Sequence, residues 1–459
     1  MNIIVVNLKR EILITDYSFF INMLEICAIG GYQNVGRNMT AIKYNDEVVI
    51  LDMGLDLERY IAYTEDEDPF SISSRQLMKA GAIPNDSIID KWKDQVLAII
   101  PTHAHLDHVG AIPFMSNKYK NAKILCTPFT AAVLERISID DKRPINNKIN
   151  VLSENSNYHL SKNIEIEFIN ITHSTPHTVV VVIHTPEGSV VYANDFKFDY
   201  NPLLGKKPNE KRLSELQDVK LLIMDSLYSD REGHTPGETW ARDQLLKIFD
   251  ENASKDNILI TTTFSSHISR LKTLVDIAKR LRRTPIFLGR SLSKYALAAQ
   301  EAGLARFEDE CEIVRYSGKV KRAINRMKKV GLSKYFIICS GHQGEPKATL
   351  TKIIKRRLLE LDNNDVVVFS STIIPNEENY RNREELEGDI KSMGAKIFTD
   401  IHVSGHASRD DHKKLIELIK PSLVIPAHAN EEKTQVMIDY CKKLGVLSKS
   451  LKEGDFFTL

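Results

Sequence analysis

The segment from Val96 to Pro113 constrains this chain more than any other. An apolar run, short enough for a buried strand, leads directly into a loop that carries His103, His105, Asp107 and His108. Three imidazoles and a carboxylate packed together without a cation would repel one another or stay unsatisfied. The pattern therefore predicts a metal site at the end of a buried strand.

The spacing within this loop predicts two ions rather than one. Side chains two positions apart in an extended loop point the same way, so His103 and His105 are expected to bind one ion together. Asp107 and His108 then face a second ion. Because one loop cannot complete both coordination shells, further ligands are expected elsewhere in the chain.

Three more side chains at predicted strand ends are candidates for this site. His173 follows an apolar strand over 164–169 and is expected to be the third ligand of the first ion, with His177 in the pocket wall. Asp195 ends a predicted hairpin and is placed to bridge both ions. Asp52, at another strand end, is expected to hold a ligand histidine by a hydrogen bond.

Composition sets broad limits on the class of protein. Of 459 residues, 42% are hydrophobic and 27% are charged, which is typical of a globular protein with two cores. The formal net charge of +1 excludes an overall field that attracts nucleic acid. Five cysteines without a CxxC pair predict reduced thiols in a cytoplasmic protein, and we expect no membrane association.

The remaining pattern suggests how the chain is divided. We expect 1–22 to be an N-terminal extension or a misassigned start, and the polar stretch 55–95 to be an exposed insertion. The glycine-rich turn 30–38 admits a structural or a phosphate-binding interpretation. After residue 219, strand-like and helix-like segments alternate, which predicts a mostly parallel sheet covered by helices.

A predicted helix over 319–330 is unusually basic. Arg322, Arg326 and Lys329 share one of its faces, which fits either RNA phosphates or an ordinary solvated surface.

The ordered motifs resemble the metallo-β-lactamase superfamily. The motif His103-x-His105-x-Asp107-His108, followed by His173 and Asp195, is specific to that group. The similarity implies an αββα sandwich with a dinuclear site at one edge.

The second half is similar to the β-CASP nucleases, in which a second α/β lobe is inserted into the metallo-β-lactamase domain. Asp225, His406 and His428 match the three motifs that this lobe and the returning chain add. Shorter motifs such as Asn194–Asp199 and His402–His406 resemble the ribonuclease J family, especially its short archaeal members. The implied α/β organisation is a first metal-domain segment over 23–228, a β-CASP domain over 229–394 and a second metal-domain segment over 395–459.

The resemblance also implies a mechanism and a set of functional residues. It implies hydrolysis of RNA phosphodiesters with two divalent metal ions, zinc being favoured and manganese also suitable. Asp107, His406 and Asp225 are the expected catalytic residues, with Asp225 orienting His406. The expected metal ligands are His103, His105, Asp107, His108, His173, Asp195 and His428.

The loop from Ser404 to Ser408 is the predicted substrate-binding segment. Small residues at a helix start let a phosphate approach backbone N–H groups, so Ser404, Gly405, His406, Ala407 and Ser408 are expected to bind the RNA 5′ end. Ser408 with Asp411 also has the pattern of a helix-capping box, which would leave Ser404 and the backbone of 405–407 as the pocket. His402 is expected to pack as structure.

Together these features predict a 5′-to-3′ exoribonuclease that prefers 5′-monophosphorylated single-stranded RNA. A β-CASP endoribonuclease of the cleavage-and-polyadenylation type, a catalytically weak RNA-binding subunit and a small-molecule hydrolase are the alternatives. A homodimer is the expected assembly. The chain has 31 residues after His428 (459 − 428), from which we expect no C-terminal domain of the bacterial kind.

Overall fold

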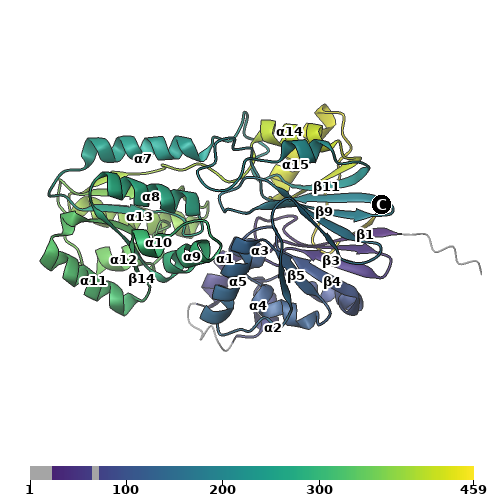
Figure 1. Cartoon of the computed structure of the whole chain (residues 1–459), viewed down its shortest axis with the longest axis horizontal. Coiled ribbons are helices and arrows are strands. Elements are labelled where there is room, and N and C mark those ends of the chain that lie inside the picture. The colour runs from purple at the N-terminus through teal and green to yellow at the C-terminus, as the bar shows by residue number, and fades with distance from the viewer. Residues whose placement is uncertain (1–22, 65–71) are drawn as a thin grey trace, which may run out of the picture.

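The computed structural model describes residues 23–64 and 72–459, which form two lobes lying side by side (Figure 1). The expected extension over 1–22 and the acidic run Glu65–Asp68 lie outside these residues. Within the described ranges, no helix is both long and apolar enough to cross a membrane. The cytoplasmic location and the homodimer stay predictions.

The first lobe contains two sheets packed face to face. The first sheet has the strand order β19-β1-β2-β3-β4-β5-β6 and the second has the order β18-β11-β10-β9-β8-β7. The first sheet is formed by β1 Leu24–Gly30, β2 Met39–Tyr44, β3 Glu47–Leu51, β4 Val96–Ile100, β5 Lys123–Cys126, β6 Ile149–Val151 and β19 Phe456–Thr458. The second is formed by β7 Ser156–His159, β8 Glu165–Asn170, β9 Val179–Thr185, β10 Gly188–Ala193, β11 Val219–Asp225 and β18 Leu423–Ala427.

One buried apolar layer lies between the two sheets. On the outer face of each sheet, a further apolar layer lies between the sheet and the helices that pack on it. Ile26, Phe168 and Ile425 belong to the layer between the sheets. The helices of this lobe are α1 Leu57–Thr64, α2 Ser74–Lys79, α3 Leu106–Val109, α4 Ile112–Met115, α5 Pro128–Asp140, α6 Glu210–Ser214, α14 Arg409–Ile419 and α15 Glu431–Lys443, with 3-10 turns at Asp86–Gln95 and Ser116–Lys118. Helices α2, α4 and α5 pack on the first sheet, and α6, α14 and α15 on the second. The predicted αββα sandwich is confirmed.

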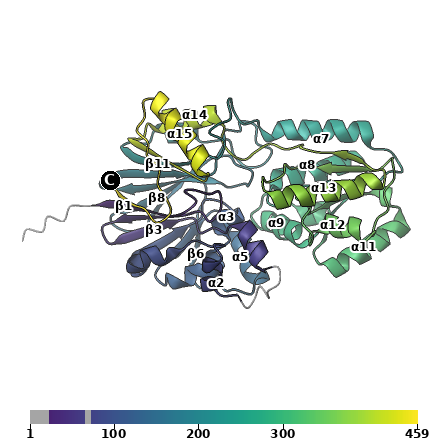
Figure 2. The same ribbon diagram turned by 180° about the vertical axis from the view of Figure 1, so that it is seen from behind.

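The second lobe is built on a wholly parallel sheet with the order β14-β13-β15-β12-β16-β17. Its strands are β12 Leu259–Thr262, β13 Thr284–Leu288, β14 Glu312–Val314, β15 Tyr335–Cys339, β16 Val366–Phe369 and β17 Lys396–Phe398. Its helices are α7 Glu238–Asn252, α8 Ile268–Arg280, α9 Arg290–Glu301, α10 Phe307–Glu310, α11 Ser317–Val330, α12 Thr349–Lys355 and α13 Glu377–Ser392, with a 3-10 turn at Leu332–Lys334. Helices α7, α8 and α9 cover one face and α11, α12 and α13 the other, as the two views show (Figure 2).

The expectation that 55–95 forms an exposed insertion is wrong for residues 72–95, whereas α1 contains no buried residue. Leu77, Ile89 and Trp92 from this stretch are at most 3% exposed and join the core outside the first sheet. Strand β17 belongs to the parallel sheet of the second lobe, although its residues fall in the predicted second metal-domain segment, 395–459. The domain limits stay a prediction.

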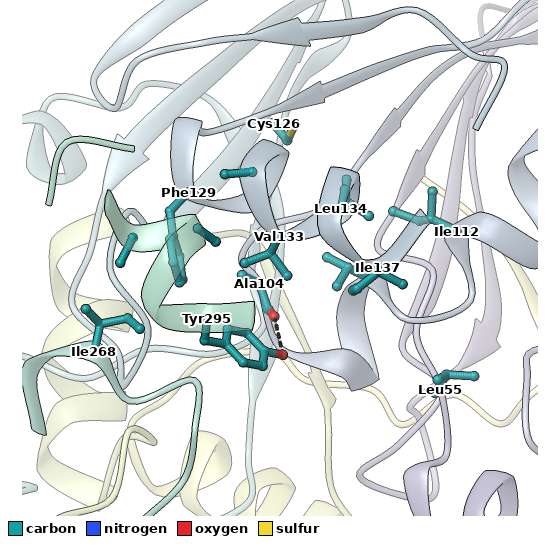
Figure 3. Close-up of a cluster of buried hydrophobic side chains, with 14 of the residues drawn as sticks. Leu55, Ala104, Ile112, Cys126, Phe129, Val133, Leu134, Ile137, Ile268 and Tyr295 are labelled. Atoms are coloured by element: carbon teal, nitrogen blue, oxygen red, sulfur yellow. Dashed lines mark hydrogen bonds between the residues drawn. The ribbon is translucent and has the colours of Figure 1, made fainter. Parts of the chain in front are cut away.

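A continuous apolar core joins the two lobes. Phe129, Val133 and Ile137 on α5 pack in one cluster with residues of α8 and α9, including Ile268 and Tyr295 (Figure 3). Helix α9 thereby reaches the first lobe, and its Tyr295 hydroxyl donates a 3.4 Å hydrogen bond to the carbonyl of Ala104. Ala104 lies between the first two predicted ligands, so the inserted lobe contacts the loop that carries them.

Candidate metal centre

The candidate metal centre lies at one edge of the sandwich, where strands of both sheets end. Parallel neighbours in a sheet present their carboxyl ends at the same edge, which brings residues far apart in the sequence together. The side chains at this edge are Asp52 after β3, His103 to His108 after β4, His173 after β8, Asp195 after β10, Asp225 at the end of β11, His406 before α14 and His428 after β18.

The predicted ligands form two clusters on either side of Asp195, and Asp195 and His428 also group with His406. The first cluster contains His103, His105, His173 and Asp195, and the second contains Asp107, His108 and His428. In each cluster the potential ligand atoms lie within 4.8 Å of one another. The structure therefore brings all seven predicted ligands together in the two expected groups.

Asp195 points one carboxylate oxygen at each cluster. Its Oδ2 lies 3.5 Å from His103 Nε2 and 3.4 Å from His173 Nε2. Its Oδ1 lies 3.2 Å from His108 Nε2 and 3.7 Å from His428 Nδ1. This geometry matches the bridging position predicted for it.

The protonation states of the first cluster suit cation binding. Burial lowers the pKa of His103 and His173 well below the usual value and lowers the pKa of His105 to about 4. A neutral imidazole has a lone pair to offer a metal ion. Burial alone would raise the pKa of Asp195, but His108 and the other surrounding imidazoles hold it well below its usual value, so this carboxylate is charged.

Unsatisfied buried atoms show that the residues fit divalent cations. Both carboxylate oxygens of Asp195 and Nε2 of His428 are buried and have no hydrogen-bond partner among the described residues. A buried, charged carboxylate without donors is costly unless a cation compensates it. Nitrogen and oxygen ligands in this number suit zinc and also manganese.

Most ligand imidazoles are held through their second nitrogen. His108 Nδ1 donates to Asp52 Oδ2 at 2.8 Å, and His173 Nδ1 donates to the carbonyl of Gly405 at 2.8 Å. His103 Nδ1 lies 3.0 Å from the hydroxyl of Thr102, which itself donates to Asp52. Such contacts fix the ring orientation and leave Nε2 facing the ion, so Asp52 has the supporting position that its strand end predicted.

His406 and Asp225 form a pair beside the clusters. His406 Nδ1 lies 2.9 Å from Asp225 Oδ2, and the His406 ring stacks on His428 with centroids 5.1 Å apart. Burial alone would lower the pKa of His406, but the neighbouring carboxylates, Asp225 first, raise it to about 9. A protonated imidazole oriented in this way can donate a proton or bind an anion.

The loop Ser404–Ser408 divides into two parts. The Ser404 hydroxyl accepts the backbone N–H of His406 at 3.0 Å and keeps its own proton free to donate. Ser408 instead forms the capping box with Asp411 at the start of α14, and its hydroxyl lies 2.9 Å from that of Thr235. Ala407 is fully buried. The His406 N–H is already bonded, so the available groups are the Ser404 hydroxyl and the backbone N–H of Gly405.

Sequence reasoning missed the role of Asn38. Its amide nitrogen lies 3.2 Å from His108 Nε2 and donates to the carbonyl of Asp107, while its amide oxygen lies 3.1 Å from His428 Nδ1. Asn194 donates to the same oxygen at 3.0 Å. The only signal in the sequence was the position of Asn38 at the end of the glycine-rich turn.

Two histidines with predicted positions, His177 and His402, lie outside both clusters. His177, expected in the pocket wall, lines a small cavity of about 30 Å³ together with His173 and Lys197. His402 lines a larger cavity of about 290 Å³ that also reaches Ser404.

Comparison with known proteins gives matches along nearly the whole described chain. The family described as "Metallo-beta-lactamase superfamily" matches residues 33–255, "Ribonuclease J, beta-CASP domain" matches 255–384, and "Zn-dependent metallo-hydrolase RNA specificity domain" matches 392–449.

Several full-length relatives are similar over most of their length. The chain is 39% identical to ribonuclease J of Methanocaldococcus jannaschii, covering 89% of this chain and 91% of that protein. It is 41% identical to ribonuclease J of Pyrococcus abyssi, covering 89% and 90%. A crystal structure of a protein of unknown function from Enterococcus faecalis has a TM-score of 0.66 at 14% identity, covering 95% of this chain and 100% of that one, a likeness of fold alone.

Proposed function

The chain belongs to the ribonuclease J family of metal-dependent ribonucleases, and on this basis we propose that it is a 5′-to-3′ exonuclease acting on single-stranded RNA with a 5′-monophosphate. The observation that carries the proposal is the pair of ligand clusters on either side of Asp195, next to the His406–Asp225 pair. In this proposal the clusters serve the hydrolysis, and the loop that carries His406 selects the RNA end.

Each cluster would hold one divalent ion, zinc by preference. His103, His105 and His173 would bind one ion, Asp107, His108 and His428 the other, and Asp195 both. Bound ions supply Lewis acidity, which lowers the pKa of water and neutralises charge that develops on the phosphate. Asp52, Thr102 and Asn38 keep the imidazoles in the orientation that this requires.

His406 would protonate the leaving oxygen or bind the scissile phosphate. Its raised pKa, to about 9, keeps the ring charged at neutral pH, and Asp225 accepts a hydrogen bond from Nδ1–H so that Nε2–H is the donor toward substrate. Asp225 itself is oriented by the backbone N–H of Leu227 at 2.7 Å. This arrangement supports a positioning role for Asp225 and a catalytic role for His406.

The Ser404 hydroxyl and the backbone N–H of Gly405 would receive the 5′-phosphate. The Ser404 hydroxyl is free to donate, and the Gly405 position has no room for a side chain, since a Cβ there would lie 2.6 Å from the His173 ring. A phosphate held here would lie next to His406 and hence next to the ions. Ser408 is committed to the helix cap and contributes less.

Degradation of end-labelled RNA tests the proposal directly. Three RNAs of one sequence, carrying a 5′-hydroxyl, a monophosphate or a triphosphate, are incubated with the pure metal-loaded protein. We expect 5′-labelled mononucleotides, and about tenfold faster decay of the monophosphate, the effect of one hydrogen bond to a charged group at about 1.5 kcal/mol. Equal rates would remove the phosphate pocket, and internal fragments would favour an endonuclease of the cleavage-and-polyadenylation type.

A further inference from the structure

A cavity of about 290 Å³ lies beside the loop that carries His406. Its volume is near the lower end of the roughly 300–1,000 Å³ typical of small-molecule sites. Residues from the segment that leads out of β11, from the first turn of α7 and from the loop before α14 line it, among them Arg231, Thr235, Trp240, His402 and Ser404.

Trp240 gives this cavity an exposed aromatic wall. Its side chain, in the first turn of α7, is 45% exposed although it lines the cavity. The other tryptophan of the chain, Trp92, is 3% exposed. A single exposed apolar side chain needs no explanation by itself, but an indole on the wall of a cavity offers a flat surface on which a ring can stack.

The His402 ring lines the same cavity, and one of its nitrogens is unpaired. Its Nδ1 is buried and has no hydrogen-bond partner among the residues the structure describes. The ring lies near Phe264 and His267, with centroids 5.6 and 6.3 Å away, and neither contact satisfies a ring nitrogen. Buried polar atoms are nearly always paired, so this nitrogen indicates a ligand or water. The expectation that His402 only packs as structure does not account for it.

The cavity is linked directly to the candidate catalytic histidine. The Thr235 hydroxyl donates to the His406 carbonyl at 2.7 Å, and the Ser404 hydroxyl accepts the His406 N–H at 3.0 Å. The guanidinium of Arg231 lies 3.4 Å above the ring of Tyr228, which is in T-shaped contact with the ring of His406. Glu232, also on the wall, is 88% exposed and lies 3.3 Å from Arg409.

We propose that this cavity binds one base of the RNA substrate, with the Trp240 indole stacked on the base and the His402 ring forming part of the wall beside it. The inference rests on the proposed function, because it takes RNA as the occupant. Stacking on an aromatic side chain tolerates every base, which suits an enzyme that degrades RNA of many sequences. Arg231 supplies positive charge close to the adjoining phosphate.

Intrinsic fluorescence tests the inference apart from catalysis. In a Trp92→Phe variant of the metal-loaded protein, Trp240 is the only tryptophan. The variant is titrated with 5′-phosphorylated oligoadenylate carrying hydrolysis-resistant phosphorothioate linkages, and retention of the same RNA on a filter is measured in parallel. We expect quenching of Trp240 that saturates together with RNA retention, and protection of Trp240 from acrylamide. RNA retention without a change in Trp240 emission or acrylamide access would overturn the inference and leave the proposed function standing.

Substitution at Trp240 gives a second, kinetic test. Trp240→Phe keeps an aromatic face, whereas Trp240→Leu keeps apolar volume without one. We expect the leucine variant to raise KM roughly 5- to 150-fold, the range for loss of one stacked base, with kcat little changed. The phenylalanine variant should stay within about threefold of the parent KM, since it keeps the stacking face. Equal KM values for both variants and the parent, at equal thermal unfolding midpoints, would contradict the stacking role. A filter assay without any RNA retention by the parent protein would instead count against the proposed function.

Discussion

The metal clusters and the basic helix α11 are built in opposite ways. In the clusters, His103, His108 and His428 are at most 1% exposed, and each side chain is held by hydrogen bonds from residues behind it. On α11, Lys321, Arg322 and Lys329 are exposed on long flexible side chains. The difference separates two tasks, since hydrolysis needs fixed atoms whereas attraction of a polyanion needs only charge at a suitable place.

The same contrast predicts how each region responds to substitution. A buried ligand has no substitute, and removing it leaves its partners unpaired. An exposed cation is one of many and is screened by salt. The largest effects are therefore expected in the clusters and the smallest on α11.

Replacement of His108 by alanine should have the largest effect. The variant loses a ligand of the second cluster and leaves Asp52 buried without its imidazole partner. We expect loss of one ion per molecule, measured by elemental analysis, and a fall in turnover greater than the about 100-fold that loss of an outer partner can cause. Full activity in a folded His108→Ala protein with one ion would contradict the dinuclear site.

Replacement of Asp52 by asparagine should cost about 10- to 100-fold in metal affinity or activity. The Asp52 carboxylate accepts a hydrogen bond from His108 Nδ1–H. Asparagine would present an N–H to the same nitrogen and so would favour the tautomer that carries its proton on Nε2. Competition with a metal chelator measures the affinity.

A matched control for this change is Asp365→Asn in the inserted lobe. Asp365 is 4% exposed and accepts hydrogen bonds from the backbone N–H groups of Ile258 and Asp362. Neither partner belongs to the metal clusters. We expect its metal affinity to equal that of the parent. An equal loss in both variants would mean that Asp52 acts through general stability.

Replacement of Gly405 by alanine should reduce turnover about tenfold, less than the 10²-fold that a displacement of about 1 Å can cost. The added Cβ would lie 2.6 Å from the His173 ring, so this imidazole must shift. Gly388→Ala, where a Cβ meets nothing within 4 Å, is the control with unchanged turnover. Initial rates at saturating RNA check the prediction, and a Gly405→Ala rate equal to that of the control would contradict the tight packing.

The double replacement of Arg322 and Arg326 should have the smallest effect. If α11 contacts RNA phosphates, the slope of log affinity against log salt should flatten by about 1.4, or about 0.7 for each cation. Arg326 is also paired with Glu312, so its share is expected to be the smaller one. An unchanged slope would assign α11 to the ordinary solvated surface.

The parts of the site that the sequence predicted are those whose chemistry is local. Four ligands crowd one loop, and the others stand directly after apolar strands, where side chains must meet at a sheet edge. Asn38 was missed because an asparagine after a glycine-rich turn equally suits the turn itself. Its partner His428 is 390 positions away, and only the folded chain brings them together.

The fold shows the same limit. The parallel sheet of the inserted lobe followed from the alternation of strand and helix patterns, which is a local signal. The stretch 55–95 is polar and irregular in sequence, which predicts an exposed insertion. Leu77, Ile89 and Trp92 are nevertheless buried, since they join the core outside the first sheet together with residues of α4 and α5.

The pairing of β18 with β11 has a consequence for the time at which the enzyme becomes active during synthesis. Ser226, after β11, donates a hydrogen bond to Ala427, which is 201 positions later and directly precedes His428. At 5–20 residues per second a ribosome needs about 10 to 40 s for that interval. Throughout it the ligands from His103 to Asp195 have been made, but the second cluster still lacks His428. Completion of the site therefore waits until the ribosome has translated the codon for His428.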